Sequence, residues 1–106
     1  MGATRLKIHQ DRHIEISRIA KVFAHPARVA ILKELSKQEG CCNDLVEVIG
    51  LSQATISQHL TVIGDAGLLY GSHKGKQRNY CLNVERLEEF QQSLNAFLTK
   101  TKSSCC

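Results

Sequence analysis

The chain has 106 residues, a formal net charge of +4 and five cysteines. Its length fits one domain with a modest core, which leaves little room for a catalytic cleft, and we expect it not to be an enzyme. It has no apolar run long enough for a membrane span and no apolar leader, so the sequence predicts a cytoplasmic protein with free thiols and no membrane partner.

The first part of the chain predicts two amphipathic helices. Asp11 is a candidate N-cap for the first helix, whose apolar residues recur at helical spacing up to Phe23. Pro26 suits the first turn of the second helix, because its missing N–H would be unpaired there in any case. Gly40 is the expected end of this second helix.

Two shorter helices separated by a tight turn come next. Asn43 and Asp44 are expected to open the first of them, and Gly50 to end it. Ser52 is the expected cap of the second, which should run to about Asp65. Two short helices joined by a turn that contains glycine are typical of a helix-turn-helix.

The second of these short helices has two different faces. Ile56, Leu60 and Ile63 fall in one narrow arc and are expected to face the core, with His59 near them as a packing residue. The opposite face and the exposed first turn carry small hydrogen-bonding side chains, which fit a major groove about 12 Å wide and can bond to base edges. The alternative is an ordinary polar surface. The predicted DNA-binding residues are Ser52, Gln53, Ala54, Thr55, Ser57 and Gln58.

The rest of the chain predicts a hairpin and a last helix. Residues 68–72 and 77–82 are the expected strands, and a polar connection around Gly75 joins them. The hairpin's basic residues are predicted to bind phosphates or the minor groove, unless they are only solvated. They are Lys74, Lys76 and Arg78. The last helix is expected from about residue 84 to 100, with one apolar face.

These elements predict a mainly α fold with a small β-hairpin, in the order of four helices, two strands and one helix. Residues 1–10 are expected to be an arm, 11–100 the winged helix-turn-helix domain and 101–106 a tail that carries cysteines. A chain this short would gain buried surface from a second copy packed through its long helices, so we expect a homodimer.

Four segments resemble the ArsR/SmtB, or arsenic-repressor, family. Members of that family are homodimeric repressors whose first and last helices form the interface. The resemblance therefore implies two recognition helices that bind an inverted-repeat operator in double-stranded DNA, with no cofactor needed for binding. An inducer, usually a metal or metalloid ion and sometimes an oxidant or reactive sulfur species, weakens that binding. The segments are 25–28 (HPAR), 44–45 (DL), 51–60 (LSQATISQHL) and 66–69 (AGLL).

The resemblance also directs attention to the cysteine pairs. Cys41 matches the first cysteine of the Cys-x-Cys-Asp-Leu pattern of some arsenic sensors, Asn43 replaces the second, and Cys42 is an addition. The last helix has no histidine, so a zinc site of the family's helical type is not expected. Thiolates select soft ions. The predicted inducer is therefore arsenite, As(III), or another soft metal ion, and its predicted ligands are Cys41, Cys42, Cys105 and Cys106.

Several alternatives stay open at this point. The cysteines could sense oxidants or reactive sulfur through a disulfide or polysulfide bridge. Cys41 and Cys42 could be small buried residues, the tail pair could be idle, and Cys81 is expected to be a packing residue. A thiol oxidoreductase or metallochaperone lacks support because no Cys-x-x-Cys spacing is present. A protein-interaction module leaves the polar helix face unexplained.

Overall fold

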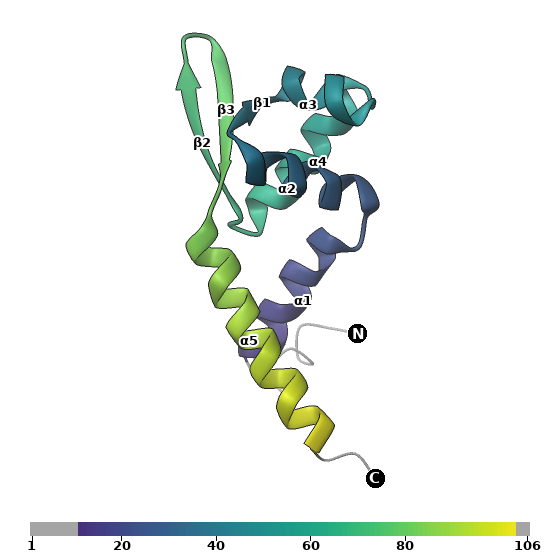
Figure 1. Ribbon diagram of the computed structural model, residues 1–106, viewed down its shortest axis with the longest axis vertical. Helices are drawn as coiled ribbons and strands as arrows, with labels where there is room; N and C mark the ends of the chain where they lie inside the picture. The colour runs from purple at the N-terminus through teal and green to yellow at the C-terminus, as the bar shows by residue number, and fades with distance from the viewer. Residues whose placement is uncertain (1–10, 104–106) are drawn as a thin grey trace, which may run out of the picture.

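The computed structural model describes residues 11–103, which form a mainly α winged helix-turn-helix with a small antiparallel sheet (Figure 1). The predicted fold class and the predicted order of helices and hairpin are confirmed, and one short strand, β1, was not predicted. The elements are α1 (Asp11–Phe23), α2 (Pro26–Lys37), β1 (Gly40–Cys41), α3 (Cys42–Ile49), α4 (Gln53–Asp65), β2 (Leu69–Lys74), β3 (Gln77–Leu82) and α5 (Val84–Ser103).

Local signals set most of the helix ends. His25 has an extended backbone and accepts the N–H of Ala27 at its Nδ1 at 3.1 Å, while Pro26 occupies the first position of α2 as predicted. Gly50 ends α3 with a φ of 84°, a left-handed conformation that glycine adopts without steric cost. Ser52 then caps α4. The tight turn between α3 and α4 therefore follows from these two residues.

Three helix ends differ from the prediction. The second helix ends at Lys37 and not at Gly40, because Gly40 lies in the strand β1, where it pairs with Tyr80 of β3. The third helix begins at Cys42, one residue earlier than expected, because the carboxylate of Asp44 accepts the N–H of Cys41 at 3.0 Å and fixes the turn there. The last helix continues to Ser103, beyond the expected end at residue 100. Residues 84–103 contain no glycine or proline that would stop a helix.

The core lies where α1, α2, α3 and α4 meet. Its largest fully buried side chains include Ile19 and Val22 of α1, Ile31 of α2, and Ile56 and Ile63 of α4. Each such side chain contributes about 1.5–3 kcal/mol when it leaves water. The helices α1 to α4 are therefore held together by their apolar inner faces.

The sheet has the strand order β1-β3-β2 and is antiparallel throughout. In the hairpin, Lys74 pairs with Gln77, so the connection has only two residues and is shorter than predicted. Gly75, the first of them, has a φ of 65°, as a tight hairpin turn requires. The unpredicted strand β1 places Cys41 opposite Asn79 of β3. This pairing brings the start of α3 to the hairpin.

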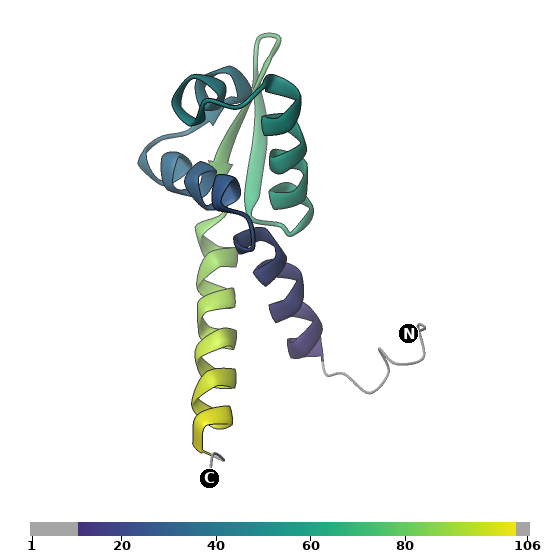
Figure 2. The same cartoon turned by 90° about the vertical axis from the view of Figure 1, so that its right-hand side faces the viewer.

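The helices α1 and α5 lie side by side at one end and extend away from the rest of the chain (Figure 2). Phe23 of α1 stacks on Phe90 of α5, with ring centroids 5.8 Å apart. Leu87, Leu94 and Phe97, on the predicted apolar face of α5, are only half-buried, and α5 has no buried residue. No helix among residues 11–103 is long and apolar enough to cross a bilayer.

Candidate nucleic-acid interface and thiol site

The outer face of α4 carries most of the side chains predicted to bind DNA. Gln53, Ala54, Ser57 and Gln58 are exposed and Thr55 is partly exposed. They offer amide, hydroxyl and methyl groups and no charge. Such groups can hydrogen-bond to base edges or contact a thymine methyl. This face therefore has the accessibility and the chemistry that base recognition requires.

The first turn of α4 is held by Ser52. Its Oγ accepts the N–H of Thr55 at 3.2 Å and donates to the Oγ1 of Thr55 at 2.9 Å. Other N–H groups in the first turn of a helix have no partner within the helix, and the helix dipole makes this end positive. The free N–H groups at the start of α4 can therefore donate to a phosphate oxygen, while Ser52 fixes the turn.

The inner face of α4 is buried, as predicted. Ile56 and Ile63 are fully buried, and Leu60 and His59 are 3% and 8% exposed. The Nδ1 of His59 lies 3.3 Å from the Nη1 of Arg28. Because arginine can only donate, a hydrogen bond between these two atoms requires the neutral imidazole with its lone pair on Nδ1.

His59 is also close to a second histidine. Its ring centroid lies 4.5 Å from that of His25. Burial, and then the nearby His25 and Arg28, lower the pKa of His59 below its ordinary value of 6.5. The buried side of α4 therefore holds an uncharged histidine against a cationic guanidinium.

The basic residues of the hairpin, which we call the wing, differ in their surroundings. Lys76, in the turn, is exposed. The guanidinium of Arg78 lies across Gly71, where an added Cβ would come within 2.5 Å of its Nη2. The same guanidinium lies 5.6 Å from the ring centroid of Tyr80. The absence of a side chain at Gly71 therefore leaves the space that the guanidinium of Arg78 occupies.

Cys41 is the buried member of the first cysteine pair. It is 6% exposed, and its thiol donates to the Oδ2 of Asp44 at 3.3 Å. The backbone N–H of Cys41, and then its thiol, lower the pKa of Asp44 by donating to the carboxylate. Asp44 is therefore ionised near neutral pH and holds the Cys41 thiol in place.

Cys42 is the more accessible member and contacts α4. Its Sγ lies 3.8 Å from the carbonyl oxygen of Gln53, to which the thiol donates. Burial, and then the neighbouring Cys41, raise the pKa of the Cys42 thiol. A weak S–H···O hydrogen bond therefore connects the cysteine pair to the first residue of α4.

One open pocket of about 270 Å³ brings these parts together. Cys41 and Cys42 line it together with Gln53 of α4 and with Lys76 and Arg78 of the wing. The sequence separates these residues and no spacing pattern predicts the pocket. It forms because β1 pairs with β3 and thereby carries the cysteine pair to the wing.

Three of the predicted site side chains, those of Cys105, Cys106 and Lys74, lie outside the described part of the chain. Cys81 is a half-buried free thiol in β3, consistent with its predicted packing role. Among residues 11–103 no three His, Cys, Asp or Glu side chains are grouped closely enough to hold a metal ion.

The sequence of residues 25–70 matches the model of a family described as bacterial regulatory protein, arsR family. The chain is 36% identical over 92 residues to the arsenical resistance operon repressor of Staphylococcus xylosus, and the match covers 87% of this chain and 88% of that protein.

Two solved structures resemble the fold. One, described as a possible transcriptional regulator for arsenical resistance, has a TM-score of 0.66 and 28% identity, covering 81% of this chain and 94% of the other. The second, an ArsR-like transcriptional regulator from Rhodococcus sp. RHA1, has a TM-score of 0.78 with 19% identity and covers 86% of each chain, so it supports the fold alone.

Proposed function

Because this chain belongs to the arsR family of bacterial regulatory proteins, it is a DNA-binding transcriptional repressor and not an enzyme. We propose that a thiophilic inducer releases it from its operator. The proposed inducer is trivalent arsenic or another soft metal ion, bound by cysteine thiolates. The observation that carries this proposal is the bond from the thiol of Cys42 to the carbonyl of Gln53. It connects a candidate inducer ligand directly to the helix that would bind DNA.

The proposed DNA contacts come from α4 and the wing. The exposed glutamines Gln53 and Gln58 suit bidentate pairing with adenine, and Ser57 can serve a base or a phosphate. Ser52, Ala54 and Thr55 complete the face, and Lys74, Lys76 and Arg78 would bind the backbone beside it. Phosphate contacts of this kind position the protein without specifying sequence.

The proposed active form is a homodimer on an inverted repeat. The half-buried apolar face of α5 and the partly exposed Phe23 of α1, 40% exposed, support it, because a second copy would cover them. A twofold dimer presents two recognition helices to two half-sites. The dimer interface would therefore consist of α1 and α5.

The start of α3 provides some, but not all, of the sulfur ligands that a soft cation would need. Two adjacent thiols are present, one held by Asp44 and one facing the pocket. A trivalent arsenic centre takes three thiolates, and no third donor is grouped with these two in residues 11–103. We propose that Cys105 or Cys106, of the same or the other subunit, supplies the third.

Ligation would act on α4 through Cys42. A cysteine that binds a metal is deprotonated, so the thiol could no longer donate to the carbonyl of Gln53. The sulfur would then move toward the ion, and the first turn of α4 would lose a contact on the side of the wing. The inducer releases DNA to the extent that it binds this altered form more tightly than the DNA-competent form.

The raised pKa of Cys42 lowers the reactivity of its thiol in disulfide exchange near neutral pH. Thiol–disulfide exchange needs a thiolate, and a raised pKa keeps the thiolate fraction low near neutral pH. A bound cation removes this obstacle, because it stabilises the deprotonated sulfur. Oxidative or reactive-sulfur sensing remains the competing outcome of the test below.

The test is operator binding titrated with arsenite, cadmium, zinc and polysulfide. The wild type is compared with Cys41→Ser, Cys42→Ser and Cys105→Ser, and Cys81→Ser serves as the matched control. We expect arsenite to release the wild type and the control, and to fail with at least one of the first three variants. Normal arsenite release from all of them would refute the thiol site, and release by polysulfide alone would favour the competing signal.

A further inference from the structure

Two arginines connect the recognition helix α4 to α1, one from α2 and one from α5. Arg28 of α2 donates from Nε to the carbonyl of Val22 at 3.0 Å and from Nη2 to the carbonyl of Lys21 at 2.8 Å. Its remaining Nη1 faces Nδ1 of His59 in α4 at 3.3 Å. One planar guanidinium thus holds the end of α1 and the inner side of α4 together.

The position of Arg28 suits this role physically. The last carbonyls of a helix have no partner within the helix and carry its negative end, so a cation there is favourable. Three donors in a rigid fork fix both the distance and the angle between the groups that accept them, which a lysine cannot do. The neutral state of His59 supplies the acceptor on α4.

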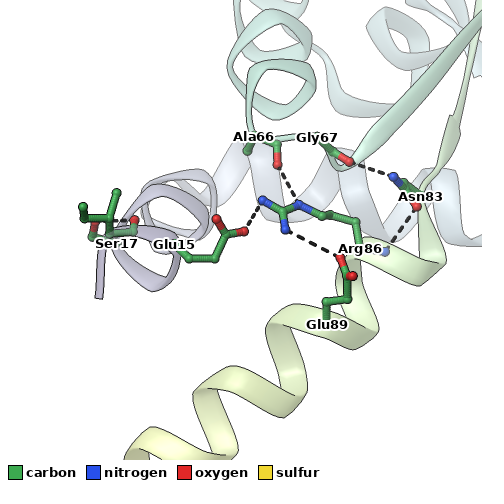
Figure 3. Close-up of polar contacts among 8 residues, drawn as sticks. Glu15, Ser17, Ala66, Gly67, Asn83, Arg86 and Glu89 are labelled. Atoms are coloured by element: carbon green, nitrogen blue, oxygen red, sulfur yellow. Dashed lines mark hydrogen bonds and ion pairs between the residues drawn. The ribbon is translucent and has the colours of Figure 1, made fainter. Parts of the chain in front are cut away.

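Arg86 of α5 makes the second connection (Figure 3). One of its terminal nitrogens forms an ion pair with Glu15 of α1, and its Nε contacts the carbonyl of Ala66, directly after α4, at 3.5 Å. The side chains of Arg86 and Glu15 are only 25% and 27% exposed, so water screens this pair less than a surface pair. Arg86 therefore joins α1, α5 and the end of α4.

The backbone around Arg86 is fixed as well. Asn83 accepts the N–H of Arg86 at 3.2 Å and donates to the carbonyl of Gly67 at 3.0 Å (Figure 3). Gly67 has a φ of 80°, and a Cβ there would lie 3.3 Å from the Nε of Arg86. The guanidinium therefore comes close to the chain that leaves α4, where glycine leaves it space.

These contacts lead to an inference about DNA recognition that rests on the proposed dimer. We propose that Arg28 and Arg86, the arginine links, are positioning residues that fix α4 relative to α1 and so set the spacing of the two recognition helices. Neither residue needs to touch DNA. Half-sites lie about 34–36 Å apart for one helical turn, and one inserted base pair turns and shifts a half-site by about a tenth of that turn. A dimer with rigid links discriminates against such a change, and a dimer with loosened links tolerates it.

The test uses Arg28→Lys and Arg86→Lys, which keep the charge and remove the fork. Arg18→Lys is the matched control, because Arg18 is an exposed arginine of α1 that lines a pocket between α1 and α4. The DNA is an inverted repeat selected by the wild type from random duplexes. It is then made with one base pair added or removed between the half-sites, and as a single half-site.

We expect the wild type and Arg18→Lys to lose about tenfold in affinity on either change of spacing, which corresponds to about 1.4 kcal/mol. Each link variant should bind the operator with the original spacing about tenfold more weakly than the wild type does. A change of spacing should weaken its binding by less than a further threefold, and its affinity for the single half-site should be close to that of the wild type. General destabilisation would instead weaken all duplexes together and would contradict the inference.

Two further outcomes would also overturn it. If the link variants prefer the original half-site spacing as strongly as the wild type does, the proposed role of Arg28 and Arg86 is refuted, while the proposed function is unaffected. A wild type without any spacing optimum would contradict the dimeric proposal itself and the links with it. If Arg86→Lys does not fold, Glu15→Gln removes the negative charge with which Arg86 pairs on α1, and it is held to the same expectation.

Discussion

The two faces of α4 can be distinguished by a pair of substitutions two residues apart, one on each face. Ile56 is fully buried, so Ile56→Ala removes about three carbon groups worth about 0.8 kcal/mol each and leaves a cavity, for a total loss of about 3–4 kcal/mol in the free energy of unfolding. Gln58 is exposed, so Gln58→Ala should change that free energy by less than about 0.5 kcal/mol. If Gln58 pairs with a base, its loss should cost about 1–3 kcal/mol of binding, about 5- to 150-fold in operator affinity.

The assays are urea unfolding and operator binding at one fixed salt concentration, because phosphate contacts make affinity strongly salt-dependent. Ile56→Val, with an expected loss of about 1 kcal/mol, is the milder variant should the alanine variant not fold. The reasoning fails if Gln58→Ala binds the operator like the wild type. It fails equally if Gln58→Ala unfolds as readily as Ile56→Ala, since α4 would then be turned differently.

Three further predictions concern other parts of the site. Cys42→Ser keeps a hydrogen-bond donor and should bind the operator within about twofold of the wild type, whereas Cys42→Ala should bind a few-fold more weakly; equal affinities would argue against the bond to α4. The lowered pKa of buried His59, beside Arg28, means that the unfolded state binds its proton more readily, so stability to urea should fall as pH drops below about 6.5, and less so in His59→Gln; identical pH profiles would contradict this. Gly71→Ala should displace Arg78, change thermal stability little and lower the salt slope of operator binding by about one, like Arg78→Ala; an unchanged slope would remove Arg78 from the phosphate contacts.

The helices and the hairpin could be predicted because each depends on residues that are close together in the sequence, above all on the spacing of the apolar residues. The spacing of Ile56, Leu60 and Ile63 matches the helical repeat, and burial of one face follows from it. Gly50 and Ser52 determine the turn between the two short helices locally. Gly50, which has no side chain, adopts the left-handed conformation that ends α3, and the hydroxyl of Ser52 caps α4. The helices and the hairpin were therefore predictable without knowledge of their packing.

The contacts that make the site depend on distant parts of the chain. The strand β1 exists only because it pairs with β3, and it sets the position of Cys41 and Cys42 beside the wing. The prediction identified both cysteines but had no means of connecting Cys42 with Gln53. Arg28 was recognised only as part of the segment that resembles the family, and Arg86 not at all, since their partners are carbonyl groups and side chains brought near by the packing of α1.

The proposal that an inducer bound by thiolates releases α4 is tested most directly by counting thiols during release. The operator complex is titrated with arsenite, and at each step free thiols are alkylated and located by mass spectrometry. We predict that loss of DNA coincides with protection of Cys42 and two further thiols. Release while Cys42 is still freely alkylated, or full protection of three thiols with the operator still bound, would contradict the account.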